Sequence, residues 1–416
     1  MAGYSPGKRG RVLAATTFGS LRVRNYRIFM SVQLVSVTGN WMQSVAQLWL
    51  VLHLTGSALA LGFVTAFRFA PILLFTSFGG LVVDRVDKRR MLMVTQAMAG
   101  LLAVALAALT LSGEVRIWMV YLIAFGLGCV NIFDGPGRQS FLHEVVGPRR
   151  IANAVALNSA TITVARVIGP ALAGLAIAWV GTGWCFLVNG LSYLPVVIGL
   201  LLMRAAELNR SAPVRPARGQ VRQGLRYAWE RPQLRVSLLV ALVVGLLALN
   251  FQVLLPLLAT RVFHGGPGTF GSLWSLMAGG SLAGALLAAA LSRPSQRLLG
   301  AAAVLFGALL CLAAVMPVLP LELVVLVPLG AAMILFQATT QSLLQLNSQA
   351  GFRGRVMALY ATVSAGSTPI GGPLVGWIAE HFGTRVAMVQ GGAASFLAGL
   401  LVLLLIAPRL RLPPPS

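Results

Sequence analysis

The chain is a succession of long apolar runs separated by short polar breaks, and this pattern continues along its whole length. Each run has about twenty residues, which as a helix is enough to cross the hydrocarbon core of a bilayer. The pattern predicts twelve membrane-spanning helices, over residues 27–52, 58–82, 91–112, 117–141, 151–179, 183–203, 235–260, 268–292, 297–316, 320–345, 354–380 and 384–407. We therefore expect an all-α membrane protein.

A basic and mostly polar segment, 204–234, divides the predicted helices into two sets of six. We expect an N-terminal six-helix bundle over 27–203 and a C-terminal six-helix bundle over 235–407. Two short terminal segments, 1–26 and 408–416, complete the chain. No soluble catalytic domain fits between the spans.

The two predicted bundles resemble each other at a fixed offset of 202 residues, in one gapless register. The matched positions are Gly128 with Gly330, Gln139-Ser140 with Gln341-Ser342, Ala156-Leu157 with Ala358-Leu359, Ile168-Gly169 with Ile370-Gly371, Gly174 with Gly376, and Gly181-Thr182 with Gly383-Thr384. Six helices separate the members of each pair, so both halves have the same orientation and form a parallel repeat. We expect two pseudo-symmetric bundles that rock about a site near the middle of the membrane.

Polar side chains recur at helical spacing on the first, fourth, seventh and tenth predicted helices, which are equivalent positions of the repeat. They are Gln33, Ser36, Asn40, Gln43, Ser44 and Gln47; Asn131, Asp134 and Arg138; Asn250 and Gln252; and Gln337, Gln341 and Gln345. Because side chains that face lipid are apolar, these stripes predict a wet substrate cavity. The alternative is that the amides only join helices by hydrogen bonds. Four stripes at symmetry-related positions favour the cavity.

The Lys and Arg residues are distributed unequally across the predicted spans. Of the 32, 27 lie on one side of the membrane, 3 on the other and 2 inside spans. Cytoplasmic segments carry such an excess, so we expect both termini and the 204–234 segment in the cytoplasm. The net charge of +23 then reflects topology and not nucleic-acid binding.

Several other chemistries are excluded by the sequence. The three cysteines all fall inside spans, where a lone cysteine is usually a small apolar side chain, so no disulfide or metal site is expected. The sequence has no GxxxxGK[ST] loop, so ATP is not the energy source. The four histidines are scattered, and no set of residues is spaced for catalysis. We expect no enzyme activity and no cofactor.

The break after the second predicted helix reads Gly80-Leu-Val-Val-Asp84-Arg85-Val-Asp87-Lys88-Arg89-Arg90. This motif resembles the loop signature of the major facilitator superfamily, with Asp87 in place of the second glycine. The resemblance implies a cytoplasmic gate in which Asp84 pairs with groups near the fourth, fifth or eleventh helix. The alternative is a loop that only anchors the cytoplasmic face. The equivalent place in the second half, Ser292-Arg293-Pro294, lacks an acid.

The fifth predicted helix reads Arg166-Val-Ile-Gly169-Pro170-Ala-Leu-Ala-Gly174. It is similar to the Gly-Pro signature of drug-antiporter families, although Ala173 stands where a second glycine is usual. Proline removes a backbone hydrogen bond and glycine thins the helix, so we expect a bend and a close interface between the two halves that contributes to gating. The alternative is a packing kink without a role in gating.

Further stretches resemble one bacterial branch of the superfamily, which includes the enterobactin exporter and macrolide efflux proteins. They are Leu34-Val-Ser-Val-Thr-Gly-Asn-Trp41, Leu54-Thr-Gly-Ser57, Phe133-Asp-Gly-Pro-Gly-Arg-Gln139, Ala152-Asn-Ala-Val-Ala-Leu-Asn158, Gly224-Leu-Arg-Tyr227 and Arg353-Gly-Arg-Val-Met-Ala358. These stretches occur in both halves, so the resemblance covers nearly the full length.

Three ionisable residues are predicted well inside the membrane, namely Asp134, Arg68 and Arg166. A buried charge without a purpose is costly, so each is a candidate site residue. Asp134 can carry a proton, or it can form a structural latch with Arg138 or with the basic loop around Lys88 and Arg89. The two arginines can bind an anionic substrate or neutralise helix dipoles.

The sequence therefore predicts a secondary transporter in the lipid bilayer, acting as a monomer. It is expected to export a small organic molecule, siderophore-like or drug-like, by alternating access in exchange for protons. The excess of buried cations favours an anionic or strongly accepting substrate, such as a phenolate or carboxylate chelator. Uptake by the same fold, or a receptor or scaffold without transport, is the alternative.

Overall fold

The protein is seen here as a computed structural model that describes residues 19–83, 85–148, 150–209, 220–291 and 294–406. The described part of the chain is helical and contains no strand, as the apolar pattern predicted. The predicted gate residue Asp84, Ser292 and Arg293, and the segments 1–18, 210–219 and 407–416 lie outside the described residues.

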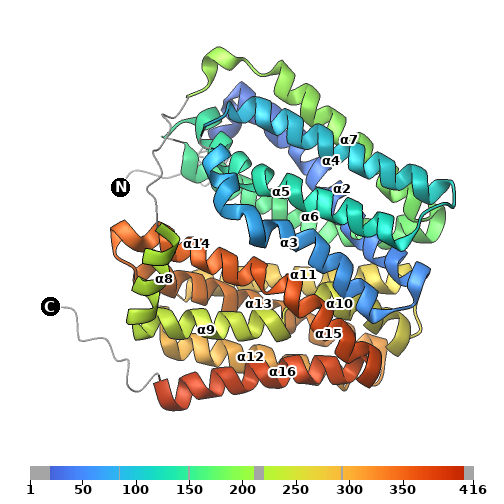
Figure 1. Ribbon diagram of the computed structural model, residues 1–416, viewed down its shortest axis with the longest axis vertical. Helices are drawn as coiled ribbons and strands as arrows, with labels where there is room; N and C mark the ends of the chain where they lie inside the picture. Colours follow the sequence, from blue (N-terminus) through green and yellow to red (C-terminus); the bar gives the residue numbers. More distant parts are fainter. Residues whose placement is uncertain (1–18, 84, 149, 210–219, 292–293, 407–416) are drawn as a thin grey trace, which may run out of the picture.

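The first half contains six long helices (Figure 1). They are α2 (Arg24–Thr55), α3 (Ala58–Val83), α4 (Lys88–Leu111), α5 (Ile117–Val146), α6 (Ile151–Val180) and α7 (Thr182–Leu202). The short 3-10 helices η1 (Gly19–Arg22) and η2 (Ala205–Glu207) lie before and after them. We call α2 to α7 the N-terminal bundle.

The second half begins with the short helix α8 (Gln220–Glu230) and then repeats the series of long helical passes. These are α9 (Pro232–Leu247) with α10 (Phe251–Leu257) and η3 (Leu258–Val262), α11 (Pro267–Ala290), α12 (Gln296–Ala314), α13 (Leu319–Leu346), α14 (Ala350–Gly366) with α15 (Thr368–Phe382), and α16 (Thr384–Leu401) with η4 (Val402–Ile406). We call α9 to α16 the C-terminal bundle.

Ten of the described helical segments are long and apolar enough to cross a membrane. The two other long passes are α2, which carries the longest polar stripe, and α14 with α15, where the helix is interrupted at Ser367. Both coincide with predicted spans; α2 is rich in polar side chains, and α14 and α15 have 17 and 15 residues. The protein is a multi-pass helical membrane protein, and the number of twelve spans stays a prediction.

The bundles lie one above the other in Figure 1. Within the N-terminal bundle, α4 packs on α7, α3 on α5, and α2 on α6 and α7. The C-terminal bundle repeats this scheme, with α12 on α16 and α11 on α13. Two crossed pairs, α3 with α15 and α6 with α11, join the bundles. The grouping follows the division predicted at 204–234, and the domain limits stay a prediction.

The sequence repeat has a direct physical explanation in the glycines that it matches. A Cβ on Gly128 would come within 2.3 Å of the Arg68 carbonyl oxygen on α3, and one on Gly330 within 2.0 Å of the Met277 carbonyl oxygen on α11. These are equivalent helix pairs, α5 with α3 and α13 with α11. Glycine at both positions lets two backbones come into contact, as in other membrane helix interfaces.

The later matched glycines serve equivalent contacts as well. Gly169 packs on α2 at Thr38 and Trp41, and Gly371 packs on the corresponding helix α9 at Leu246. Farther along the same two helices, Gly174 meets the start of α11, and Gly376 meets the start of α3. Each of the second pair of contacts crosses between bundles, so the repeat encodes both the interior of a bundle and the interface.

Two further matched glycines make turns. Gly181, between α6 and α7, has φ +85°, and Gly383, between α15 and α16, has φ +93°. A side chain at positive φ is strained, so glycine is the residue that allows each helix to end and the next to begin without a connecting loop. Figure 1 shows the resulting adjacency of α15 and α16.

The turn between α2 and α3 and the helix α8 lie at opposite ends of the molecule (Figure 1). At one end, here the α2–α3 end, α2 ends at Thr55 and α3 begins at Ala58. At the opposite end, Asn25 exchanges two hydrogen bonds of 3.1 Å with the backbone of Arg204, which ties the start of α2 to the end of α7. The basic helix α8 lies at this opposite end, in contact with α14.

Candidate functional site

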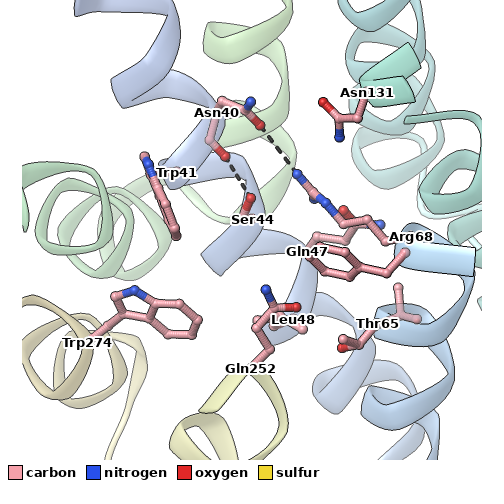
Figure 2. A pocket seen from close by; sticks show the side chains of 12 residues that line it. Asn40, Trp41, Ser44, Gln47, Leu48, Thr65, Arg68, Asn131, Gln252 and Trp274 are labelled. Atoms are coloured by element: carbon pink, nitrogen blue, oxygen red, sulfur yellow. Dashed lines mark hydrogen bonds between the residues drawn. The ribbon is translucent and has the colours of Figure 1, made fainter. Parts of the chain in front are cut away.

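A cavity of about 220 Å³ lies between the two bundles and is lined by side chains of both (Figure 2). Its lining residues are Asn40, Trp41, Ser44, Gln47 and Leu48 of α2, Val64, Thr65, Arg68 and Phe69 of α3, Asn131 of α5, Gln252 of α10 and Trp274 of α11. A smaller cavity of about 20 Å³ shares Asn40, Arg68 and Asn131 with it and adds Ser36, Asp134 and Arg138. The polar stripes of the first and fourth predicted helices thus meet at one place.

The predicted stripe on α2 divides between two environments. Asn40, Ser44 and Gln47 line the larger cavity. Gln43 instead faces α7, where its Oε1 accepts a hydrogen bond of 2.5 Å from Asn189 Nδ2. Gln33 is fully buried and lines neither cavity. Gln43 therefore joins two helices, as in the alternative interpretation, whereas Asn40, Ser44 and Gln47 line the cavity.

The Arg68 guanidinium enters the cavity from α3. Its Nη2 lies 3.5 Å from Asn40 Oδ1, at the outer limit of a hydrogen bond. A guanidinium has five N–H donors, so most of its capacity is not used by this contact. Figure 2 shows Arg68 reaching toward Asn40 across the cavity from the two tryptophans.

The Arg166 guanidinium lies behind the same stretch of α2. Its Cζ is 5.2 Å from the centre of the Trp41 ring, a cation–π distance. Its Nε is buried and has no hydrogen-bond partner among the described residues. Arg166 does not line the larger cavity directly, but it contacts a side chain that does.

Asp134 is held in a network within the N-terminal bundle. One carboxylate oxygen, Oδ2, pairs with Arg138 Nη2 at 2.7 Å, and the other accepts hydrogen bonds from Gln96 at 2.6 Å and Thr95 at 3.1 Å. Of the partners suggested for a latch, Arg138 is the one in place. Thr95 and Gln96 on α4 were not predicted, since their roles depend on how α4 packs against α5.

The basic residues after α3 have other partners. Lys88 pairs with Glu144 of α5 at 3.3 Å, and Arg89 donates to the carbonyl oxygens of Leu200 and Leu201 at 2.6 and 2.8 Å. Neither residue pairs with Asp134 in this structure, so of the two alternatives for the latch the pair with Arg138 is the one that is formed. Both contacts instead join α4 to its neighbours at the opposite end from the α2–α3 turn.

Three further residues of the loop motif, Gly80, Arg85 and Asp87, lie at the end of α3 and the start of α4. Gly80 lies in the last turn of α3 and Arg85 is exposed after it. Asp87, at the place of the usual glycine, caps α4 by accepting a hydrogen bond of 3.0 Å from the Arg90 backbone N–H. An aspartate at a helix N-cap is favourable because it satisfies an otherwise free N–H group. The gating role of the motif stays a prediction.

The Gly-Pro motif of α6 lies at the interface that it was expected to form. The Pro170 carbonyl oxygen approaches Gly271 of α11, and Gly174 meets Gly268 and Gly271. Ser275 of α11 also donates a hydrogen bond of 2.8 Å to the Val167 carbonyl oxygen. Small residues therefore bring the two bundles into backbone contact here.

In the C-terminal bundle the predicted stripes contribute less. Asn250 lies at the break between α9 and α10 and donates a hydrogen bond of 2.8 Å to the Leu246 carbonyl oxygen, whereas Gln252 lines the cavity. On α13, Gln337 is half-buried, and Gln341 and Gln345 are exposed. None of these three lines either of the two cavities. The site is thus asymmetric, with most polar groups from the N-terminal bundle.

Three contributions were missed by the sequence reasoning. The aromatic wall of Trp41 and Trp274, with ring centres 6.3 Å apart, comes from both bundles and had no polar signal. Arg261 and Glu380, which form an ion pair, lie at the ends of predicted spans, where a charged residue is ordinary and gave no signal. Glu322, one turn into α13, is fully buried, and neither carboxylate oxygen has a partner among the described residues.

Metal chemistry has no candidate ligand set in the part of the chain that the structure describes. No group of three or more His, Cys, Asp or Glu residues is close enough together to hold a metal ion. The polar groups of the cavity are amides, hydroxyls and guanidinium groups. Such groups bind organic molecules through hydrogen bonds and charge.

Comparison with known proteins places this geometry among transporters. A family model described as a transmembrane secretion effector matches residues 15–414. The multidrug efflux pump Tap of Mycolicibacterium fortuitum is 28% identical over 389 residues, 91% of this chain and 94% of Tap. The enterobactin exporter EntS of Citrobacter koseri is 24% identical over 389 residues, 89% of this chain and 86% of EntS.

A solved structure has the same fold at lower sequence identity. It is a bacterial homologue of the human lysosomal transporter Spinster, in an inward-facing and unoccupied conformation. The TM-score is 0.71 at 16% identity, with 93% of this chain and 95% of that chain covered. The sequence resemblance to the major facilitator superfamily is confirmed by these comparisons.

Proposed function

The chain belongs to the transmembrane secretion effector family of major facilitator transporters, and on that premise we propose that it exports a small organic molecule from the bacterial cytoplasm in exchange for protons. The observation that carries the proposal is a polar cavity lined by both bundles. The N-terminal bundle contributes Asn40 and Arg68 to it, and the C-terminal bundle contributes Gln252 and Trp274. A site shared by two bundles changes its access when they rock.

Alternating access is supported by the closure of one end. Gly174 against α11 and Gly376 against α3 bring the bundles into contact close to the α2–α3 end. Arg261 and Glu380 of the C-terminal bundle add hydrogen bonds to the Gly56 carbonyl oxygen and the Ala58 backbone N–H of the N-terminal bundle there. Rocking about these contacts would open the α2–α3 end and close the opposite one, which exchanges the side from which the cavity is reached.

The direction of transport is supported by charge and by relatives. The excess of Lys and Arg at the opposite end favours a cytoplasmic location of that end, and of both termini. Tap and EntS, which resemble this chain over most of its length, are named as an efflux pump and an exporter. Uptake by the same fold remains the second candidate.

Proton coupling needs a group whose charge changes during the cycle. Asp134 lines the smaller cavity, where its carboxylate forms an ion pair with the Arg138 guanidinium. In an exchanger the proton and the substrate bind in alternation, so Asp134 would take up a proton on the return step and release it, restoring the pair with Arg138, before the substrate binds. The rival role, a permanent latch between the two residues, predicts transport without a change at Asp134.

Purified protein in liposomes tests the proposal. An imposed pH gradient, acidic on the side of the α2–α3 end, should drive accumulation of exported compounds from a panel of siderophores and drugs. Gln252→Leu, which removes a cavity amide, should slow transport several-fold, whereas Gln345→Leu, an exposed glutamine of the same bundle, should not. Equal fluxes in protein-containing and empty liposomes across the panel would refute transport.

A further inference from the structure

The cavity carries positive charge that the protein does not neutralise. Arg68, Arg138 and Arg166 lie in or beside the two cavities, and Asp134, which lines the smaller one, is the carboxylate among their described lining residues. Both oxygens of Asp134 are already engaged, with Arg138, Gln96 and Thr95. Two guanidinium groups, those of Arg68 and Arg166, therefore have no carboxylate partner among the described residues.

These two guanidinium groups approach consecutive residues of α2. Arg68 Nη2 is 3.5 Å from Asn40 Oδ1, and Arg166 lies over the ring of Trp41. Burying a cation in a membrane protein is costly unless it has a partner or a function. An amide oxygen at this distance compensates little of the Arg68 charge, so the cavity is prepared for a ligand that accepts hydrogen bonds and carries negative charge.

An aromatic wall faces Arg68 across the cavity. Trp41 and Trp274 have ring centres 6.3 Å apart and planes at 55°, and they come from different bundles. Figure 2 places both rings on the side of the cavity away from Arg68. Arg166 lies over the Trp41 ring and restrains it. A flat ring that packs on this wall would touch both bundles at once.

One polar group of the cavity, Gln47, lies beside Arg68 and has no hydrogen-bond partner among the described residues (Figure 2). Gln47 lines the cavity with only 2% of its surface exposed, and its Oε1 and Nε2 have no hydrogen-bond partner among the described residues. A buried amide without partners is unfavourable, and a ligand with a hydroxyl or amide group would satisfy it. This group sets a second polar requirement beside the anion site.

We propose that the cavity selects a planar aromatic anion, with its carboxylate or phenolate on Arg68, its ring against Trp41 and Trp274, and a further polar substituent at Gln47. This inference rests on the proposed function and names the substrate class of the same site. The same charges disfavour organic cations, so a chain similar to a multidrug efflux pump is assigned an anionic cargo.

Equilibrium binding to the purified full chain in nanodiscs tests the assignment. The probes are 2-naphthoate, its neutral isostere 2-naphthamide, the non-aromatic anion cyclohexanecarboxylate and the cation tetraphenylphosphonium. A charge-assisted hydrogen bond adds about a tenfold preference. We expect 2-naphthoate to bind at least tenfold more tightly than each of the other three.

Variants assign the preference to residues. Arg68→Gln should weaken 2-naphthoate about tenfold and leave 2-naphthamide unchanged, and Arg68→Lys should retain part of the preference because it keeps the charge. Trp274→Leu should weaken both naphthalene probes alike. The matched control is Arg385→Gln, since Arg385 donates to the Met316 carbonyl oxygen near the α2–α3 end and does not line the cavity.

The outcomes separate this inference from the proposed function. Equal or tighter binding of 2-naphthamide or tetraphenylphosphonium, or an equal effect of Arg68→Gln on both naphthalene probes, would overturn the aromatic-anion site. If those probes are also transported in liposomes, the transporter proposal stands without it. If 2-naphthoate binds as expected and no compound is transported, the site stands and the export proposal fails.

Discussion

Arg261 of η3 and Glu380 of α15 form an ion pair of 2.9 Å beside the turn between α2 and α3. Glu380 Oε2 also accepts a hydrogen bond of 2.6 Å from the Ala58 backbone N–H. Arg261 donates a hydrogen bond of 2.5 Å to the Gly56 carbonyl oxygen. A carboxylate at the start of α3 is favoured by the helix dipole as well. Two side chains of one bundle therefore cap the backbone of the other.

Removing this charged contact should favour opening of the α2–α3 end. The pair is about one-third exposed, so the ion pair and the Ala58 hydrogen bond together are worth about 1–2 kcal/mol. Glu380→Gln should then raise the rate at which a cysteine introduced at Thr65, in the cavity, is labelled by an impermeant maleimide from that side, by about tenfold.

The control for this experiment is Glu114→Gln. Glu114 is an exposed acid at the same end, and its replacement changes the charge by the same amount. Labelling that is the same in Glu380→Gln, Glu114→Gln and the parent would show that the ion pair does not hold this end closed.

Asp134→Asn distinguishes a latch from a proton carrier. If Asp134 is a latch, the variant leaves Arg138 buried without its carboxylate and lowers the free energy of unfolding by about 3–5 kcal/mol, and adding Arg138→Gln restores part of it. We expect this result, measured by thermal unfolding in detergent. If Asp134 also carries the proton, the variant will in addition lose transport driven by a pH gradient and retain substrate exchange without a gradient.

Alanine at the matched glycines should destabilise both halves alike. At Gly128 and Gly330 the added Cβ would meet a backbone carbonyl oxygen, which cannot move without separating the helices. We expect a loss of about 1–3 kcal/mol for each variant, seen as a lower midpoint of thermal unfolding. Gly135→Ala is the control on α5, because nothing lies within 4 Å of its added Cβ.

The sign of the control is itself informative. Alanine is favoured over glycine in a helix by about 1 kcal/mol, so Gly135→Ala should be neutral or stabilising. Equal unfolding midpoints for Gly128→Ala, Gly330→Ala and Gly135→Ala would mean that the helices can separate freely, contrary to the close backbone approach of α5 with α3 and of α13 with α11.

The orientation in the membrane is tested by labelling two engineered cysteines. A cysteine at Arg226, exposed on α8, should react with an impermeant maleimide only after cells are permeabilised, whereas one at Glu114 should react in intact cells. The reason is the excess of basic residues at the α8 end. Labelling of the Arg226 position in intact cells would reverse the topology.

The sequence by itself determined the helical passes, the repeat and the charge asymmetry. Each depends on local composition, as in the apolar length of α12, or on a spacing within the chain, as with Gly181 and Gly383. It also located Asn40, Arg68 and Asn131 as cavity residues, because polar groups inside spans are few. The pairing of Asp134 with Arg138 was accessible too, since one helical turn separates them.

Only the tertiary structure decided which members of a polar stripe face the cavity. Gln43 and Gln47 are one turn apart on α2, yet one bonds to Asn189 of α7 and the other lines the site, because α7 packs on α2 at Gln43 and the cavity lies beside Gln47. The pair of Arg261 and Glu380 is 119 residues apart in sequence. The bonds of these two side chains to Gly56 and Ala58 depend on how the two bundles lean together, and composition or periodicity along one helix carries no information about that angle.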